Sequence, residues 1–217
     1  MKILNTLARL LFPPKCLLCG KLLSKNQQDL CDRCRFETPE YTSHHFSIPF
    51  VAQWRAMWYY EGDVRRSLLR YKFGSQRGYA HGYGRLLAAA LSDMPFDLIT
   101  AVPISSRRKR KRGYDQVSLL ACAVGKELGK IPIPLLRKVR DNPAQSGISG
   151  YAQRKANVLG VYQVISPELL IGKRVLLLDD IITTGATVSE CARVLLTAGA
   201  KEVVCAAIAA GRQSKIQ

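Results

Sequence analysis

Apolar and polar positions along the chain follow two periods, which predict a series of strands and helices. Short apolar runs predict strands over residues 56–60, 98–102, 135–139, 175–178 and 203–208. Apolar residues at helical spacing predict helices over residues 3–11, 63–71, 79–91, 116–128 and 187–198. Mixed, polar composition predicts a linker over residues 39–49 and a loop over residues 141–151.

The C-terminal part of this pattern is the most informative about the fold. A strand at residues 175–178, a helix at 187–198 and a strand at 203–208 follow one another directly. This order is a βαβ unit, which implies a parallel sheet with a right-handed crossover. The four consecutive apolar residues of the first strand indicate that both of its faces are buried. We therefore predict an α/β fold in which helices flank a parallel sheet.

Size and charge narrow the class of protein. The chain has 217 residues, of which 47% are hydrophobic, and this length suits one main domain plus a small module. The net charge of +17 favours partners such as nucleic acid, an anionic membrane or a phosphorylated ligand. No apolar run approaches the ~20 residues of a membrane span. Arg9 interrupts the apolar N-terminus and no cleavage site follows, so we expect a short helix docked on the protein rather than a signal peptide.

Four of the seven cysteines form two Cys-x-x-Cys pairs near the N-terminus, at Cys16, Cys19, Cys31 and Cys34. Two such pairs separated by a short loop are typical of a structural zinc site with four thiolate ligands. Disulfides would require an oxidising compartment, and a redox centre would need only one pair. We therefore place a zinc module in residues 1–45, followed by the main domain in residues 46–217. The other cysteines, Cys122, Cys191 and Cys205, are expected in the core.

The strand at 175–178 leads into a candidate ligand site. Two carboxylates, Asp179 and Asp180, end the strand, and the next helix begins just after a short loop of Thr183, Thr184, Gly185, Ala186 and Thr187. Backbone N–H groups at a helix N-terminus and threonine hydroxyls can hold a phosphate. The carboxylates can accept hydrogen bonds from ribose hydroxyls, directly or through hydrated Mg²⁺. The alternative is a strand–turn–helix corner in which an aspartate caps the helix. The complete pattern resembles the phosphoribosyl diphosphate (PRPP) signature of type I phosphoribosyltransferases.

A run of six cations, residues 107–112, follows the strand at 98–102 and precedes the helix at 116–128. We expect a loop here. Its candidate ligand-binding residues are Arg107, Arg108, Arg110, Arg112 and Gly113. Ligands of an open α/β sheet bind at the carboxyl ends of its strands, so this loop and the acid pair should lie at one edge. Pyrophosphate and a nucleic-acid backbone are both suitable ligands for this run. The alternative is that the run is a solvated charged face without a ligand.

Taken together, these motifs resemble the ComF family, whose members combine an N-terminal zinc ribbon with a phosphoribosyltransferase-like domain. The match includes Phe12 to Gly20, Tyr71 to Gly74, the basic run with Gly113, Tyr114 and Gln116, and the PRPP loop. Asp115 stands where the family often has Asn, which leaves its role open. The resemblance implies a type I phosphoribosyltransferase fold, a cytoplasmic location and a role in DNA uptake during natural transformation. It also implies that Asp179 and Asp180 bind ribose and metal while residues 183–187 hold the 5-phosphate.

Three functional hypotheses follow. The chain could be an enzyme that displaces pyrophosphate from PRPP with Mg²⁺, in which case Asp179 and Asp180 are the catalytic pair. It could be a binding module for single-stranded DNA or a competence helicase that uses PRPP only as a sensor ligand. Finally, the fold could be scaffolding with a vestigial site, which the intact acid pair and threonine loop argue against. The sequence favours PRPP binding and a role in DNA uptake, and it leaves the acceptor open.

Overall fold

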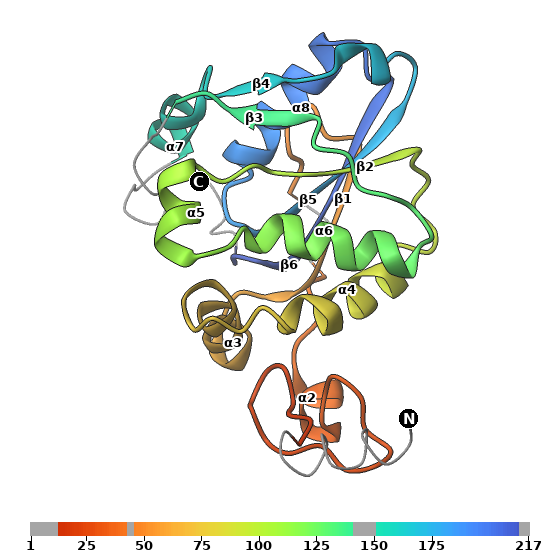
Figure 1. The fold of residues 1–217 in the computed structure, drawn as a ribbon, viewed down its shortest axis with the longest axis vertical. Helices are drawn as coiled ribbons and strands as arrows, with labels where there is room; N and C mark the ends of the chain where they lie inside the picture. Colours follow the sequence, from red (N-terminus) through yellow and green to blue (C-terminus); the bar gives the residue numbers. More distant parts are fainter. Residues whose placement is uncertain (1–12, 43–45, 141–150, 213–217) are drawn as a thin grey trace.

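The computed structural model describes residues 13–42, 46–140 and 151–212. Its centre is a parallel sheet with the strand order β1-β6-β5-β2 (Figure 1). The strands are β1 (Gln53–Tyr59), β2 (Leu98–Ala101), β5 (Arg174–Ile182) and β6 (Glu202–Ala210). All pairings in this sheet are parallel, which confirms the predicted fold class.

Helices cover both faces of the sheet. On one face lie α3 (Gly62–Phe73), α4 (Tyr79–Ala90) and α6 (Gln116–Glu127), and on the other lies α8 (Ala186–Thr197) (Figure 1). Alternate residues of β5 supply the two cores: Leu176 and Leu178 join the cluster with α3, α4 and α6, whereas Val175 and Leu177 join the cluster with α8. The alternation is the period of two of an extended strand, and it confirms the prediction of burial on both faces.

Two further strands form a separate antiparallel ribbon. They are β3 (Leu136–Lys138) and β4 (Tyr162–Val164), and they pack with α8 rather than joining the sheet. Between them lies α7 (Tyr151–Val158), and a 3₁₀ turn, η2 (Pro167–Leu169), follows β4. The sequence predicts β3 but not β4, because three residues are too few to show a clear alternation.

The cysteine pairs fold into a small module that lies against α3, at one end of the molecule (Figure 1). It contains the loop of the first pair and a short helix, α2 (Asp32–Glu37). The backbone carbonyls of Leu17 and Leu18 accept hydrogen bonds from Arg70 of α3, at 3.2 and 2.6 Å, and Ser67 donates a further one to Leu17. Leu17, Leu18 and Leu30 belong to the same buried cluster as α3 and α4, so module and domain share one core.

The predicted linker is packed against the domain where it is described. The Tyr41 ring lies 5.2 Å from that of Trp54 and 4.9 Å from that of Tyr59, and Ile48 is fully buried. Residues 39–49 were predicted as a linker because the segment is mostly polar, and its few apolar residues that pack against the domain did not stand out. None of the helices in the described ranges combines the length and apolar character needed to cross a bilayer.

One core prediction is wrong. Cys191 and Cys205 are buried as expected, but Cys122 is exposed. The buried stripe of α6 follows Val117, Leu120, Ala121 and Val124, and Cys122 falls between these positions, on the solvent side. The helix expected over residues 3–11 lies outside the described residues, as do residues 141–150 of the loop expected over residues 141–151; Tyr151 begins α7.

Candidate functional site

A pocket of about 250 Å³ opens where β2 and β5 end. Its walls come from these strand ends, the loop before α8, the N-terminus of α6, two residues of a basic helix and the ribbon β3–β4. The lining includes the acid pair Asp179 and Asp180, the loop residues Thr183, Thr184, Gly185, Ala186 and Thr187, and the cations Lys72, Arg108, Arg112 and Lys138. The structure therefore brings the two predicted motifs, acidic and basic, to the same edge of the sheet.

Asp180 is the most strongly held carboxylate of this pocket. One oxygen lies 2.8 Å from Nζ of Lys72, and the other accepts a hydrogen bond of 2.7 Å from Nε2 of Gln116. Gln116 is buried, and the Lys72 side chain is 16% exposed. Tyr71 and Tyr114 fix the backbone beside them: Tyr71 donates to the Gln116 carbonyl at 2.5 Å, and Tyr114 donates to the Tyr71 carbonyl. This network joins the end of α3 to the start of α6 and to β5.

Asp179 has a different environment. Burial raises its pKa to about 8, with a further contribution from the charge of Asp180, while Lys72 opposes the shift. One carboxylate oxygen accepts a hydrogen bond of 2.8 Å from the backbone N–H of Asp180. A cation bound beside Asp179 would favour its ionised form and so lower this pKa.

The loop after the acid pair leads into the N-terminus of α8, where the N-cap residue is a glycine. Gly185 has φ of 72° and no side chain with which to cap this end. A Cβ at Gly185 would lie only 3.0 Å from Ile48, so both the backbone angle and the packing require glycine. The first N–H groups of α8 consequently face a pocket that Thr183, Thr184 and Thr187 also line. Such an end attracts anions, phosphate groups above all.

The basic run is a helix and not the loop predicted from the sequence. It is α5 (Ser106–Arg112), which begins where the Ser105 hydroxyl accepts the Arg108 N–H and ends at Gly113 with φ of 76°. Arg and Lys are good helix formers and are favoured near a helix C-terminus. These two effects outweigh the repulsion between the neighbouring cations. Only Arg108 and Arg112 of the candidates line the pocket, whereas Arg107 and Arg110 are exposed and Gly113 terminates the helix. Burial lowers the pKa of Arg112, and the charge of Asp180 opposes that shift.

The sequence did not assign four residues of this pocket to the site: Lys72, Gln116, Lys138 and Tyr162. Two of them, Lys72 and Gln116, belong to the motifs of the family resemblance. Gln116 is informative because it is 2% exposed and its Oε1 atom has no hydrogen-bond partner within the described ranges. Its amide nitrogen is engaged with Asp180, so this acceptor remains available for a ligand hydroxyl or a metal-bound water. A polar residue on the apolar face of α6 is the signal that could have identified it.

Asp115 has a structural role. Its Oδ1 accepts hydrogen bonds of 3.0 Å from the backbone N–H groups of Val117 and Ser118, which caps α6. Asn and Asp are equivalent at such a position, so the departure from the family pattern leaves the helix start unchanged.

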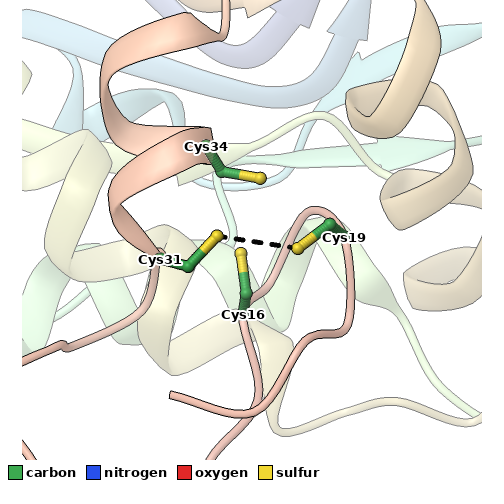
Figure 2. A group of neighbouring side chains, drawn as sticks. All are labelled: Cys16, Cys19, Cys31 and Cys34. Carbon is green, nitrogen blue, oxygen red and sulfur yellow. Dashed lines mark hydrogen bonds between the residues drawn. The ribbon is translucent and has the colours of Figure 1, made fainter. Parts of the chain in front are cut away.

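The four N-terminal cysteines converge on one point (Figure 2). Cys16 and Cys19 come from a loop and Cys31 and Cys34 from the start of α2, and all four sulfurs lie within 4.8 Å of one another. The sulfurs of Cys19 and Cys31 are 3.7 Å apart. A tetrahedral zinc with bonds of about 2.3 Å requires sulfur–sulfur edges of about 3.8 Å, so the donor set fits zinc. Four thiolates complete the coordination, which makes this a structural rather than a catalytic site.

The comparisons with known proteins agree with both parts of the chain. Residues 116–217 match the model of the phosphoribosyl transferase domain, and residues 7–45 match that of the double zinc ribbon domain. Competence protein ComFC of Streptococcus pneumoniae is 30% identical over 149 residues, which cover 69% of this chain and 64% of that protein. Competence protein F of Haemophilus influenzae is 27% identical over 190 residues, which cover 80% of this chain and 81% of that protein.

Among solved structures, the glutamine PRPP amidotransferase of B. subtilis matches with a TM-score of 0.45 and 24% identity, over 63% of this chain and 30% of that one. The family matches and the folded chain define a type I phosphoribosyltransferase domain that carries an N-terminal double zinc ribbon. The chain shares this combination of domains, and sequence similarity to the two competence proteins, with the ComF family.

Proposed function

We propose that this chain binds PRPP together with Mg²⁺ in the pocket at the end of β5 and acts in DNA uptake during natural transformation. One observation carries the proposal: Asp180, held by Lys72 and Gln116, lines the same pocket as the N-terminus of α8, whose N-cap residue is a glycine. A carboxylate pair for ribose hydroxyls and a phosphate-binding helix end are the two parts that a phosphorylated ribose needs. The role in DNA uptake is inferred from the relatives, whose names refer to competence, and the cytoplasmic location belongs to the same proposal.

Each part of PRPP has a counterpart in the pocket. The 5-phosphate would bind residues 183–187 at the α8 N-terminus, and the ribose hydroxyls would face Asp179, Asp180 and the free oxygen of Gln116. The pyrophosphate would bind the cationic side chains of Lys72, Arg108 and Arg112. Asp179 and Asp180 are also the oxygen ligands that Mg²⁺ prefers, and the ion would offset the negative charge of the diphosphate.

Transfer of the ribose phosphate is the enzymatic form of this proposal. Displacement of pyrophosphate passes through a ribose with oxocarbenium character, so catalysis needs positioning and charge stabilisation rather than a covalent step. Arg108 and Arg112 would stabilise the charge that develops on the leaving pyrophosphate, and Asp179 and Asp180 would orient the ribose.

The experiment is PRPP consumption with pyrophosphate release, measured with Mg²⁺ and with or without single-stranded DNA. Turnover that requires an acceptor supports a phosphoribosyltransferase. Saturable PRPP binding without turnover supports a sensor role in a DNA-uptake module. Absence of PRPP binding in zinc-loaded protein would contradict the proposal in both forms.

A second candidate function is single-strand binding, with a competence helicase as a possible partner. The specific observation is that Arg107, Lys109, Arg110 and Lys111 project from α5 into solvent beside the pocket. A single strand loses affinity with salt at a log–log slope of about −0.7 per neutralised phosphate. Replacing these four cations by Ser should therefore flatten the slope by up to about 3 units while leaving PRPP affinity intact.

The matched control removes the same charge elsewhere. Arg65, Lys126, Lys173 and Lys201 are also exposed and lie outside α5. Their replacement by Ser should leave most of the slope in place. Equal flattening in both variants would mean that DNA responds to the net charge of +17 and not to α5.

A further inference from the structure

One aromatic side chain at the rim of the pocket has an unusual position. Phe73 is the last residue of α3 and is 62% exposed, whereas Val64, Leu68 and Tyr71 of the same helix are buried. The preceding residue, Lys72, contacts Asp180 inside the pocket. An exposed phenylalanine therefore lies one residue from the predicted PRPP contacts.

A cation from a different element lies over this ring. The guanidinium carbon of Arg112, at the end of α5, is 4.9 Å from the centroid of the Phe73 ring. Arg112 also lines the pocket, so the Phe73–Arg112 pair lies where the pocket meets the surface. Such a pair is stabilised by cation–π attraction, which orients the ring although solvent surrounds much of it.

The neighbouring loop repeats this chemistry and fixes the two elements together. Arg77 lies 5.2 Å from the Tyr114 ring and donates a hydrogen bond of 2.8 Å to the Gly113 carbonyl. The end of α3 and the end of α5 are thus tied side by side. The outward face of α5 beside them carries four exposed cations, Arg107, Lys109, Arg110 and Lys111.

We propose that Phe73, with Arg112, is a stacking platform for a nucleobase of a single strand whose phosphates run along the exposed cations of α5. Aromatic rings and guanidinium planes both stack on bases, and a row of cations beside them suits the phosphates of a strand. A free base carries no phosphate for the cations to bind, and a phosphorylated sugar carries no base to stack on the ring. The proposal deepens the second candidate function and rests on it, and it places a base at the mouth of the PRPP pocket.

The test compares a labelled oligodeoxynucleotide with an abasic strand of equal length and charge, by fluorescence anisotropy at constant salt. The proteins are the zinc-loaded full chain, Phe73→Ala, Phe73→Trp and the control Phe36→Ala. Phe36 is 79% exposed on α2, and no described cation lies over its ring. Calorimetry with PRPP and Mg²⁺ is run on each protein.

We expect wild type to prefer the base-bearing strand, by roughly fivefold to 150-fold for one stacked base. Phe73→Ala should abolish this preference and leave the abasic strand and PRPP affinities unchanged. Phe73→Trp should keep it, and Phe36→Ala should behave as wild type.

Several results would overturn the proposal. They are equal affinity of wild type for both strands, binding of neither strand, or an equal loss for both strands in Phe73→Ala. A change of oligomeric state in Phe73→Ala would instead assign the ring to a contact between copies of the chain. Failure of wild type to bind PRPP would contradict the proposed PRPP function alone, because the comparison of the two strands does not depend on it.

Discussion

The two sites of this molecule, the four-cysteine cluster and the pocket at the end of β5, differ in how completely their polar groups are satisfied. In the cluster four sulfurs face one another within 4.8 Å, which leaves no position open once zinc is bound. In the pocket, Asp180 is paired, but the buried Oε1 atom of Gln116 has no hydrogen-bond partner within the described ranges, and the first residues of α8 line the cavity. A closed site stabilises a fold, whereas an open one with unused donors and acceptors is suited to a ligand.

Helix α3 connects these two sites. Ser67 and Arg70 donate hydrogen bonds to the carbonyls of the two leucines between Cys16 and Cys19. At the end of the helix, Lys72 contacts Asp180. Arg33 beside Cys34 adds an ion pair of 2.8 Å with Asp63 in the first turn. The geometry of the zinc module therefore bears on the position of Lys72, although no cysteine of the cluster touches the pocket.

Removal of zinc should have the largest effect. Structural zinc contributes about 10–16 kcal/mol of apparent binding energy in small modules, so Cys16→Ser should lose zinc and unfold residues 13–42. We expect the sheet to remain folded, with a lower melting temperature and weaker PRPP binding because α3 loses its carbonyl acceptors. Elemental analysis, thermal denaturation and calorimetry measure these changes.

The control for this variant is Cys122→Ser, which alters an exposed thiol on α6 and should change none of the three readouts. A Cys16→Ser protein that lacks zinc but retains the melting temperature and PRPP affinity of wild type would show that the two sites are independent.

Breaking the Lys72–Asp180 pair should have the next largest effect. Removal of one partner of a buried ion pair costs about 3–5 kcal/mol, so Lys72→Met should lower the free energy of unfolding by up to this amount. Loss of a charged hydrogen bond of about 1.5–3 kcal/mol should weaken PRPP binding roughly tenfold or more. Adding Asp180→Asn should recover much of the stability, since no charge is then unpaired, but not the binding. Urea denaturation and calorimetry separate these effects, and a double variant no more stable than Lys72→Met would contradict the account.

Asp179 predicts a pH dependence. Its pKa of about 8 means that the folded, unliganded protein keeps this carboxyl protonated at neutral pH. Because Mg²⁺ and ribose require the ionised form, PRPP affinity should rise with pH, by up to about tenfold per unit, and level off above about pH 8.

The same group affects stability with the opposite sign. Between the ordinary aspartate pKa of about 4 and the folded value, the native state binds more protons than the unfolded state, so its contribution to unliganded stability falls as pH rises. Asp179→Asn should remove both trends. Calorimetry and urea denaturation at pH 6 to 9 would check this, and an unchanged pH profile in the variant would assign the titration to another group.

The smallest effects concern Asp115. Asp115→Asn should change the free energy of unfolding by less than about 0.5 kcal/mol, because either side chain caps α6. Asp115→Ala should cost about 1 kcal/mol through loss of the cap. PRPP affinity should be unchanged in Asp115→Asn, as measured by calorimetry, and a clear loss would assign Asp115 a role in the pocket.

The sequence predicts the zinc cluster better than the pocket, because the cluster is local. Cys16, Cys19, Cys31 and Cys34 reveal their site by spacing alone, and the acid pair with its threonine loop is equally contiguous. Lys72, Gln116, Lys138 and Tyr162 reach the pocket from four other elements, so only the tertiary fold brings them together. The basic run was predicted as a loop because the prediction rested on its charge and not on the capping residues at its two ends, Ser105 and Gly113.

Calorimetric titration of PRPP with Mg²⁺ into the zinc-loaded full chain and into Asp180→Asn tests the central claim most directly. The account predicts one binding site per wild-type chain and an affinity at least roughly tenfold lower in the variant, through loss of a charged acceptor. Equal affinity in the two proteins, or no binding by wild type, would contradict it.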